Sequence, residues 1–310
     1  MSLLAFVARH GRWVLPAGLA LGIAVPPLAR AMEPAIVPLL GFLLFLAALR
    51  IGPGAARPRP GELPRALMWT AALQIVPPLA AIAGLGALGW LAHPVGLGVV
   101  LVLAASPITG APGLAILSGA APAPALRQLV LGTALLPLTV LPVFAVLPVF
   151  AAPGDVAAAV LRLLAVIGVA GAGGFALRAR WPGLGEGRGA VAIDGLTSLS
   201  MGLVVIALTS ALGPALLAGD AALWAVLALV FVLNFGTQLA TLAVVRARGA
   251  GRDASALAIV AGNRNLALFL AALPEPVGQA LLLFVGCYQV PMFLTPLLLA
   301  PLYRRLGDSG

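Results

Sequence analysis

The stretch that decides the fold is Ala261-Gly262-Asn263-Arg264-Asn265-Leu266, in which a glycine, two amides and a guanidinium interrupt an apolar segment. The uncharged runs on either side, residues 254–261 and 266–273, are each too short to cross a bilayer at about 1.5 Å per helical residue. Lipid offers no hydrogen-bond partner to the backbone, so a break at mid-membrane depth requires surrounding protein or a water-filled cavity. The stretch therefore predicts a broken membrane-spanning helix whose charged residue is a candidate functional site.

A second interrupted stretch, Ser106-Pro107-Ile108-Thr109-Gly110-Ala111-Pro112-Gly113, occupies a comparable place in the first half of the chain. One broken helix in each half is the sequence pattern of a secondary transporter whose site lies between the two breaks. We therefore expect Ser106, Thr109 and Gly110 to lie beside residues 262–265.

Composition places the chain in a lipid bilayer. Of its 310 residues, 62% are hydrophobic and 9% are charged, and its mean hydropathy is +1.13. Soluble domains have about 45–50% apolar and about 25% charged residues. The net charge of +9 comes from 18 basic residues, all arginine, most of which lie between apolar runs. This distribution indicates membrane topology and not a phosphate-binding surface, so we expect no nucleic-acid partner.

Apolar windows of about 20 residues predict an all-α polytopic protein with ten transmembrane helices. Most of the polar connections between them are short, and the longest is the cytoplasmic loop 52–64. The expected spans lie near residues 13–30, 35–51, 66–89, 95–120 (broken), 126–150, 157–178, 190–213, 220–245, 254–273 (broken) and 278–303.

The arginines predict the orientation of these spans. When loops are assigned alternately to the two sides, one side receives Arg30 alone, together with Glu33, Asp155, Asp220 and Glu275. The positive-inside rule makes the other side cytoplasmic, which puts both termini in the cytoplasm and the protein in the inner (plasma) membrane. The arginines on that side are Arg9, Arg12, Arg50, Arg57, Arg59, Arg65, Arg127, Arg178, Arg180, Arg188, Arg246, Arg248, Arg252, Arg304 and Arg305.

The chain is expected to be a single membrane domain, residues 1–310, built from two repeats. Five spans precede residue 152 and five follow it, and an odd number per half requires an inverted repeat. Residues 1–152 form the first predicted repeat and residues 153–310 the second. The breaks support this division because each falls in the fourth span of its half, so we expect discontinuous helices four and nine to cross.

Two further features fit the layout. The first apolar run ends in Ala29-Arg30-Ala31 and superficially resembles a signal peptide, but removing it would leave an odd helix count. The tryptophans fall at the predicted ends of spans, where their amphipathic rings prefer the interface, and none falls in the middle. Trp13, Trp69 and Trp181 are on the cytoplasmic side, and Trp90 and Trp224 are on the other.

Three charged residues fall within the predicted spans at least four residues from either end: Arg162, Asp194 and Arg264. Arg162 is close enough to the outer end of its span for the side chain to snorkel to the interface. Asp194 lies near the cytoplasmic mouth of the span 190–213, which carries hydroxyls at helical spacing after it, and it is either at a solvated helix start or faces a cavity. Arg264 either faces the transported molecule or caps carbonyls freed by the opposite broken helix, and one residue can do both.

Amides in apolar helices extend the candidate site. Asn234 and Gln238 lie four residues apart on one helix face, and Gln74 precedes the Pro77-Pro78 kink. We expect Asn234 and Gln74 to face a cavity, since both flank the presumed crossing, and we interpret Gln289 as an ordinary interhelical hydrogen-bonding residue.

Other chemistries lack the residues they need. His10 and His93 both lie at predicted membrane ends, so neither a histidine metal site nor a Ser-His-Asp triad can form at depth. No lysine is present to complete a Walker motif, which excludes ATP-driven pumping by this chain alone. We therefore expect no enzymatic activity and no cofactor, apart from a possible coupling sodium ion.

Three short motifs together resemble the bile acid:sodium symporter superfamily. Residues 262–268 (Gly-Asn-Arg-Asn-Leu-Ala-Leu) look like its ninth-helix Gly-x-x-Asn motif, and Ser106-Pro107 with Thr109-Gly110 resembles its fourth-helix break. Asn234-Phe235-Gly236 loosely resembles its helix-eight Asn-x-x-Gly region. The resemblance implies a panel domain, a core domain with crossing helices four and nine, and transport of organic anions by alternating access.

The chain departs from the sodium-coupled members at the positions that would bind the ion. Val260 stands where they have an acidic residue, Arg264 where they have a glutamine, and Pro112-Gly113 where they have a Ser-Asn pair. These changes remove hard-cation ligands and add a fixed positive charge. The resemblance and its departures therefore predict transport of a small organic anion, with Arg264 in place of a bound cation and sodium coupling weakened or absent.

Two alternatives stay open. The arsenical-resistance branch resembles this fold but uses a cysteine in the fourth-helix region, whereas Cys287 lies in the last span. A membrane sensor or assembly scaffold could also keep the fold without its ion site. A transporter should have a polar cavity that reaches the crossing from one side, and a scaffold should fill that space with apolar side chains.

Overall fold

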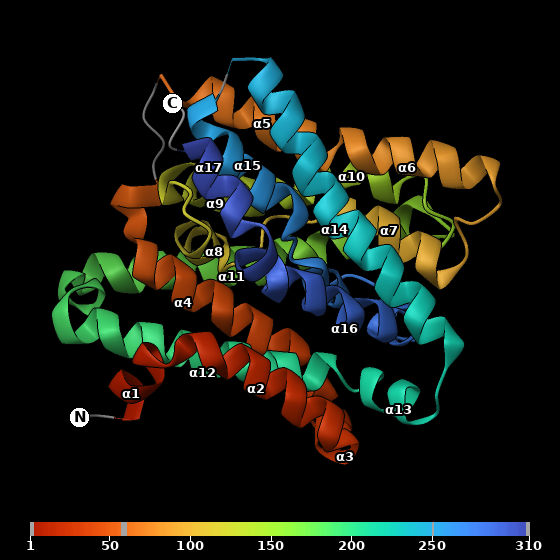
Figure 1. Cartoon of the computed structure of the whole chain (residues 1–310), viewed down its shortest axis with the longest axis horizontal. Coiled ribbons are helices and arrows are strands. Elements are labelled where there is room, and N and C mark those ends of the chain that lie inside the picture. The colour runs from red at the N-terminus through yellow and green to blue at the C-terminus, as the bar shows by residue number, and fades with distance from the viewer. Residues whose placement is uncertain (1–2, 57–60, 250, 308–310) are drawn as a thin grey trace.

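The computed structural model describes residues 3–56, 61–249 and 251–307, and within them the chain is a bundle of α-helices without β-strands (Figure 1). Arg57 and Arg59 of the expected basic loop lie outside the described residues. The first and last helices, α1 (Leu3–Arg9) and α17 (Ala300–Gly307), lie toward the left of Figure 1.

The helices divide at the long connection before residue 153. Those of the first half are α1 (Leu3–Arg9), α2 (Gly11–Ala24), α3 (Pro26–Met32), η1 (Glu33–Ala35), α4 (Ile36–Ala56), α5 (Leu63–Gln74), α6 (Val76–Ala87), α7 (Pro94–Ala104), α8 (Ala111–Leu117), α9 (Pro122–Thr139) and α10 (Leu141–Phe144). Those of the second half are α11 (Pro153–Arg180), η2 (Pro182–Gly185), α12 (Gly187–Leu208), α13 (Leu212–Leu217), α14 (Ala221–Ala247), α15 (Gly251–Gly262), η3 (Leu266–Ala271), α16 (Glu275–Leu298) and α17 (Ala300–Gly307).

The lengths and compositions of these helices fit a multi-pass membrane protein. Within the described residues, seven helical stretches are long and apolar enough to cross a bilayer, and three shorter apolar helices accompany them. The long stretches are Pro26–Ala55, Leu63–Ala87, Pro122–Phe144, Pro153–Arg180, Gly187–Leu208, Ala221–Ala247 and Glu275–Leu298. The shorter ones are Trp13–Ala24, Pro94–Ala104 and Asp253–Gly262.

Prolines interrupt several of these stretches where the sequence places them in pairs. Proline lacks an N–H and clashes with the preceding turn, so it breaks the helical ladder. Pro77 and Pro78 separate α5 from α6 at Ile75, as the sequence predicts. Pro26 and Pro27 separate α2 from α3 at Val25, inside the expected span 13–30. Each break leaves backbone carbonyls that need donors from elsewhere.

The helices pack in two groups. α2, α4, α11 and α12 pack mainly on one another, whereas α5, α7, α9, α14, α15 and α16 form the second group. Figure 1 shows α2, α4 and α12 together along the lower side and α5, α6 and α14 along the upper side. The largest cluster of buried apolar side chains lies between the groups and includes Leu101, Phe269 and Phe284.

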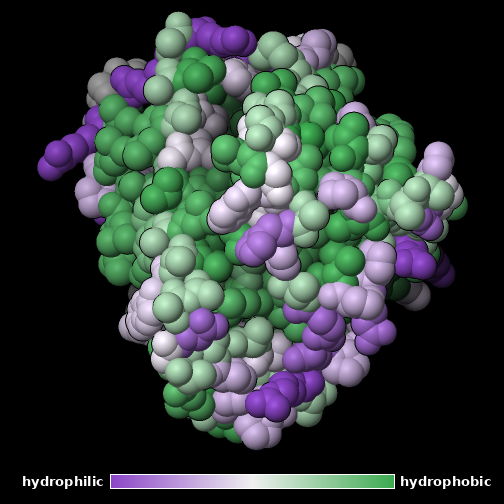
Figure 2. Space-filling model, turned by 90° about the vertical axis from the view of Figure 1, so that its right-hand side faces the viewer, coloured by the Kyte–Doolittle hydropathy of each residue, from purple (hydrophilic) through white to green (hydrophobic). Residues whose placement is uncertain are grey.

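Apolar side chains also cover much of the outside, as expected for a surface in contact with lipid. Leu161, Leu164 and Val169 of α11 are exposed. In Figure 2, hydrophobic residues cover most of the visible face and hydrophilic residues form separate small groups. Four of the five tryptophans are exposed, and Trp69 alone is buried.

Ion pairs agree with the sidedness that the arginines predict. The four salt bridges among the described residues each join two residues from the arginine-rich side: Arg50–Asp194, Arg65–Asp253, Arg127–Glu62 and Arg178–Glu186. On the opposite side, Gln279 donates a 3.4 Å hydrogen bond to Glu33.

The contact between α4 and α11 generates the first prediction. A Cβ atom added at Gly174 would lie 2.5 Å from the Phe45 carbonyl oxygen and 2.7 Å from the Ala48 Cβ, whereas one added at Gly171 meets nothing within 4 Å. We expect Gly174→Ala to lower stability by about 1–3 kcal/mol because the backbones must separate. Thermal unfolding of the purified protein in detergent measures the change.

The matched control is Gly171→Ala on the same helix. Alanine is the better helix former by about 1 kcal/mol, so this variant should be as stable as the wild type or slightly more stable. Equal effects of the two substitutions would contradict the close packing of α4 on α11.

Candidate functional site

The two interrupted segments meet and satisfy each other's backbone groups. Pro107 and Arg264 form an antiparallel bridge. The Ile108 N–H donates to the Asn263 carbonyl at 2.9 Å, and the Asn265 N–H donates to the Ser106 carbonyl at 2.8 Å. Non-helical backbone is tolerated at such depth only where protein supplies its hydrogen bonds, and here each break supplies them to the other.

The first break is shorter than the sequence suggests. Residues 105–110 are non-helical, but α8 already begins at Ala111 and contains Pro112 and Gly113. Proline fits the first turn of a helix because the N–H that it lacks would have no intrahelical partner there. Pro112 therefore starts a helix at a position where the sequence suggested that the break continues.

Arg264 joins three backbone carbonyls at the crossing. Its side chain is 3% exposed. Nε donates to the Ala261 carbonyl at 2.7 Å, and the two terminal nitrogens donate to the carbonyls of Ala105 at 2.8 Å and Leu73 at 2.9 Å. The planar guanidinium thus ties together the ends of α15, α7 and α5.

Each of these carbonyls is free for a local reason. In an α-helix a carbonyl accepts from the N–H four residues later. For Leu73 that residue is Pro77, which has no N–H. For Ala261 it is Asn265, whose N–H donates to Ser106 across the crossing. The Ala105 carbonyl lies beyond the last residue of α7. Arg264 therefore caps the carbonyls that the breaks leave open, as one of the two sequence readings holds.

Within the described residues, the charge of Arg264 has no carboxylate partner. None of the four ion pairs found in the described residues includes it. Carbonyl dipoles solvate a guanidinium but do not neutralise it, and a charge in low dielectric acts over a longer range than one in water. A positive field therefore extends from the crossing into the space beside it.

Gly262 allows α15 to approach α14. A Cβ atom at this position would lie 2.4 Å from both the Asn234 carbonyl oxygen and the Gln238 Cγ. The Gly262 carbonyl accepts hydrogen bonds from the Asn234 amide and from the Tyr288 hydroxyl. Only glycine permits this close contact between the two helices.

The remaining amides form a continuous network behind the crossing. The Asn263 side chain donates to the Ile259 carbonyl at 2.8 Å and accepts from the Thr295 hydroxyl at 3.2 Å. Gln238 donates to Asn234 at 2.6 Å and accepts from the Tyr303 hydroxyl at 2.8 Å.

A small cavity adjoins the crossing between the two helix groups. Its volume of about 40 Å³ suits one or two water molecules. The crossing contributes Thr109, Arg264 and Asn265, and α16 contributes Gln289. The opposite wall is aliphatic and comes from α2, α4 and α12: Leu15, Leu40, Leu43, Met201, Val204, Val205 and Leu208.

Asn265 is the amide at the crossing that faces this cavity. Its backbone N–H donates to the Ser106 carbonyl, but within the described residues its side chain makes no hydrogen bond. Thr109 lies beside it, and Gly110 caps the N-terminus of α8. The Ser106 hydroxyl is buried and lacks a partner in the described part of the chain. Asn265 and Thr109 thus line the cavity, whereas Ser106 does not, and the hydrogen-bonded amides of Asn234 and Asn263 lie outside its lining.

Gln74 lies next to the crossing but faces away from the cavity. Its amide donates to the Gly132 carbonyl at 3.0 Å and accepts from the Thr139 hydroxyl at 2.9 Å, which ties α5 to α9. The expectation that it lines a cavity is wrong, because the Pro77-Pro78 break turns this face of α5 toward α9. Asn234, also expected to line the cavity, lies instead in the network behind the crossing, because its amide bonds to Gly262.

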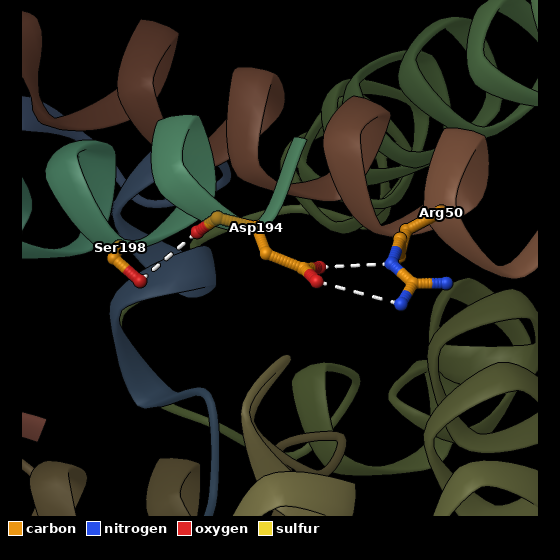
Figure 3. Close-up of polar contacts among 3 residues, drawn as sticks. All are labelled: Arg50, Asp194 and Ser198. Carbon is orange, nitrogen blue, oxygen red and sulfur yellow. Dashed lines mark hydrogen bonds and ion pairs between the residues drawn. The ribbon is translucent and has the colours of Figure 1, made fainter. Parts of the chain in front are cut away.

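Asp194 is remote from the crossing and lies at the arginine-rich end. Figure 3 shows its carboxylate directed at Arg50 of α4, with a 2.8 Å contact to Nε. Both side chains are close to half exposed, at 47% for Asp194 and 45% for Arg50. The Ser198 hydroxyl donates to the Asp194 backbone carbonyl at 3.0 Å. Of the two sequence readings, the solvated position is the one observed, but Asp194 lies two turns inside α12, which begins at Gly187.

Three residues at the site were missed or misjudged in the sequence. Tyr288 and Thr295 of α16 hold the crossing from behind, and their only signal is a polar atom inside an apolar helix. Gln289 was interpreted as an interhelical hydrogen-bonding residue, but its amide contacts only Val285 of its own helix, at 3.4 Å, and lines the cavity.

Comparison with known proteins adds nothing to this geometry: the chain matches no protein-family model, and it matches no curated protein.

The contacts of Arg264 generate the second prediction. We expect Arg264→Lys to lower stability by about 2–4 kcal/mol, since one ammonium group cannot reach three carbonyls that lie in different directions and leaves buried acceptors unpaired. Thermal unfolding in detergent is the measurement. Arg162→Lys, at an exposed position on α11, is the control and should behave like the wild type. If Arg264→Lys melts at the wild-type temperature, the three carbonyl contacts of Arg264 do not contribute to stability.

Proposed function

We propose that the protein is a secondary transporter that moves a small organic anion across the inner membrane by alternating access. The observation that carries the proposal is the uncompensated charge of Arg264, which lies where two interrupted segments meet beside a cavity between two helix groups. Charged residues inside a membrane are costly, so one without a counter-charge is a binding-site candidate for an ion of opposite sign.

We propose the finer fold as ten transmembrane helices in two inverted repeats, residues 1–152 and 153–310. Support comes from the position of each break, which falls in the fourth apolar stretch of its half. The first and last helices, α1 and α17, lie toward the same side of the bundle in Figure 1, as an even number of crossings requires. The salt bridges join residues of the arginine-rich side, which we assign to the cytoplasm.

Arg264 takes the place of a coupling cation in this proposal. A sodium ion at a helix crossing would be held by carbonyl and side-chain oxygens. Here the carbonyls of Leu73, Ala105 and Ala261 already accept from the guanidinium. A second cation beside it would meet both occupied ligands and electrostatic repulsion. We therefore infer that transport does not depend on sodium.

The two helix groups supply the moving parts. Alternating access requires one bundle to rock against another around a fixed site. The cavity lies at the boundary between the groups, with polar atoms on the wall formed by the crossing and aliphatic side chains on the wall of α2, α4 and α12. In this arrangement the anionic group of the substrate would contact Asn265 and Thr109, and its apolar part would lie against the aliphatic wall.

One observation favours a second candidate, a membrane sensor or scaffold. The cavity is small and its lining is mostly apolar, as expected of a protein that no longer transports a substrate. Arsenite-type efflux has less support, because the free Cys287 is fully buried in α16 and does not line the cavity.

Sodium dependence tests the transport proposal. The full-length protein in detergent would be screened by thermal shift against carboxylates that range from short aliphatic acids to steroid carboxylates. Uptake of a stabilising acid into proteoliposomes is then measured with a sodium or a choline gradient at equal ionic strength. We expect the two rates to agree within about twofold. Uptake that occurs only with sodium would refute the role given to Arg264, and the absence of any binding acid would favour the scaffold.

A comparison of two neighbouring asparagines forms the next prediction. Asn265→Ala should weaken binding of that acid by about tenfold or more, the value of one hydrogen bond to a charged group. Its melting temperature without ligand should not change, because the Asn265 side chain makes no hydrogen bond to the described residues.

Asn263→Ala is the matched control. Its amide joins Ile259 to Thr295, so this change should lower the melting temperature, and the protein that stays folded should bind the acid with near-normal affinity. The reverse pattern would place the substrate on the other face of the crossing.

A further inference from the structure

A larger hollow lies away from the crossing, at the arginine-rich end of the second helix group. Its volume is about 1070 Å³. The first turns of α5, α9 and α15 line it, together with the end of α14 and Leu306 of α17. It does not include any residue of the crossing, so it is separate from the candidate transport site.

The N-terminal ends of three helices contribute partial positive charge to the hollow, and Pro64, Pro122 and Pro124 in the first turns of α5 and α9 have no N–H to donate. The N-terminus of a helix carries about half a positive charge and unpaired N–H groups. The N-cap residues of α5 and α9, Glu62 and Ala121, make no side-chain capping hydrogen bond. The convergence of these ends with arginine side chains is the arrangement that proteins use for phosphate groups.

Among the described residues, three arginines and two carboxylates line the hollow, which leaves one positive charge in excess. Arg127 and Glu62 form a close pair at 2.9 Å. Arg65 and Asp253 are 3.6 Å apart, too far for a good hydrogen bond, so most donors of Arg65 are free. Arg246 is exposed and has no ion-pair partner among the described residues.

Trp69 supplies an independent sign of a ligand. It is 6% exposed and lines the hollow, and its Nε1 atom is buried without a hydrogen-bond partner in the described part of the chain. A buried indole N–H normally finds an acceptor. The other four tryptophans are exposed, so the burial of Trp69 is particular to this place.

We propose that the hollow is a binding site for a phosphate group, held by Arg246 and Arg65 at the converging N-termini of α5, α9 and α15. A phosphate offers several oxygens to donors that converge from different directions. The hollow is much larger than a bare phosphate ion, so the group belongs either to the headgroup of an anionic phospholipid or to a soluble phosphorylated molecule. This inference does not rest on the proposed transport function.

The test uses the purified full-length protein and two probes. Native mass spectrometry measures retention of phosphatidylglycerol against phosphatidylcholine, and thermal shift measures the affinity for inorganic phosphate. We expect Arg246→Gln to lower the affinity for the probe that binds by about tenfold or more, since it removes a charge-assisted contact. Asp253→Asn should strengthen binding, because it removes a competing carboxylate. The melting temperature of each variant without a probe confirms that it is folded.

Arg188→Gln is the matched control, an exposed arginine of α12 at the same end of the molecule but outside the hollow. Arginine-dependent retention of phosphatidylglycerol alone identifies a lipid headgroup, and competition by inorganic phosphate identifies a soluble ligand. Either result supports the site. Failure of both probes to bind, or an equal loss in Arg188→Gln and Arg246→Gln, would overturn it.

Discussion

The structure depends on one constraint: two interrupted backbone segments lie among apolar helices, where lipid cannot complete their hydrogen bonds. Residues 105–110 and 263–265 solve this by pairing with each other. The Ala105 and Ala261 carbonyls beside the pairing and the Leu73 carbonyl freed by Pro77 have no backbone donor, and Arg264 donates to all three. An unpaired buried carbonyl costs about 1–3 kcal/mol, so the guanidinium is a structural part of the crossing as well as its charge.

These two roles are compatible because different parts of the side chain perform them. The N–H groups are directed at backbone carbonyls, whereas the charge, which no carboxylate cancels, acts through space. A bound metal ion would also bind the carbonyls and supply positive charge, but it could dissociate. A covalently attached guanidinium cannot dissociate, and this difference is the physical basis for proposing an anion transporter without a coupled cation.

The sequence predicted the breaks because polar residues inside apolar runs are costly unless they serve a purpose. It also predicted a kink at Pro77-Pro78, where the structure separates α5 from α6. It could not show that the carbonyl freed by Pro77 would be capped by Arg264, 191 residues later. The predictions for Gln74 and Gln289 failed for the same reason. The direction in which an amide points depends on how its helix is rotated about its own axis. A helix that is apolar all round has no polar face from which that rotation can be predicted. Asp194 likewise found its partner 144 residues away.

The distances along the chain between Arg264 and two of its acceptors also constrain how the protein is made. Ala105 precedes it by 159 residues and Leu73 by 191. Translation delivers the first half to the bilayer well before Arg264 leaves the ribosome, so during that interval these carbonyls have no donor from the completed crossing. The newly inserted N-terminal half is therefore an unfinished intermediate, and water, the insertion machinery or a chaperone must shelter its open backbone until the second half arrives.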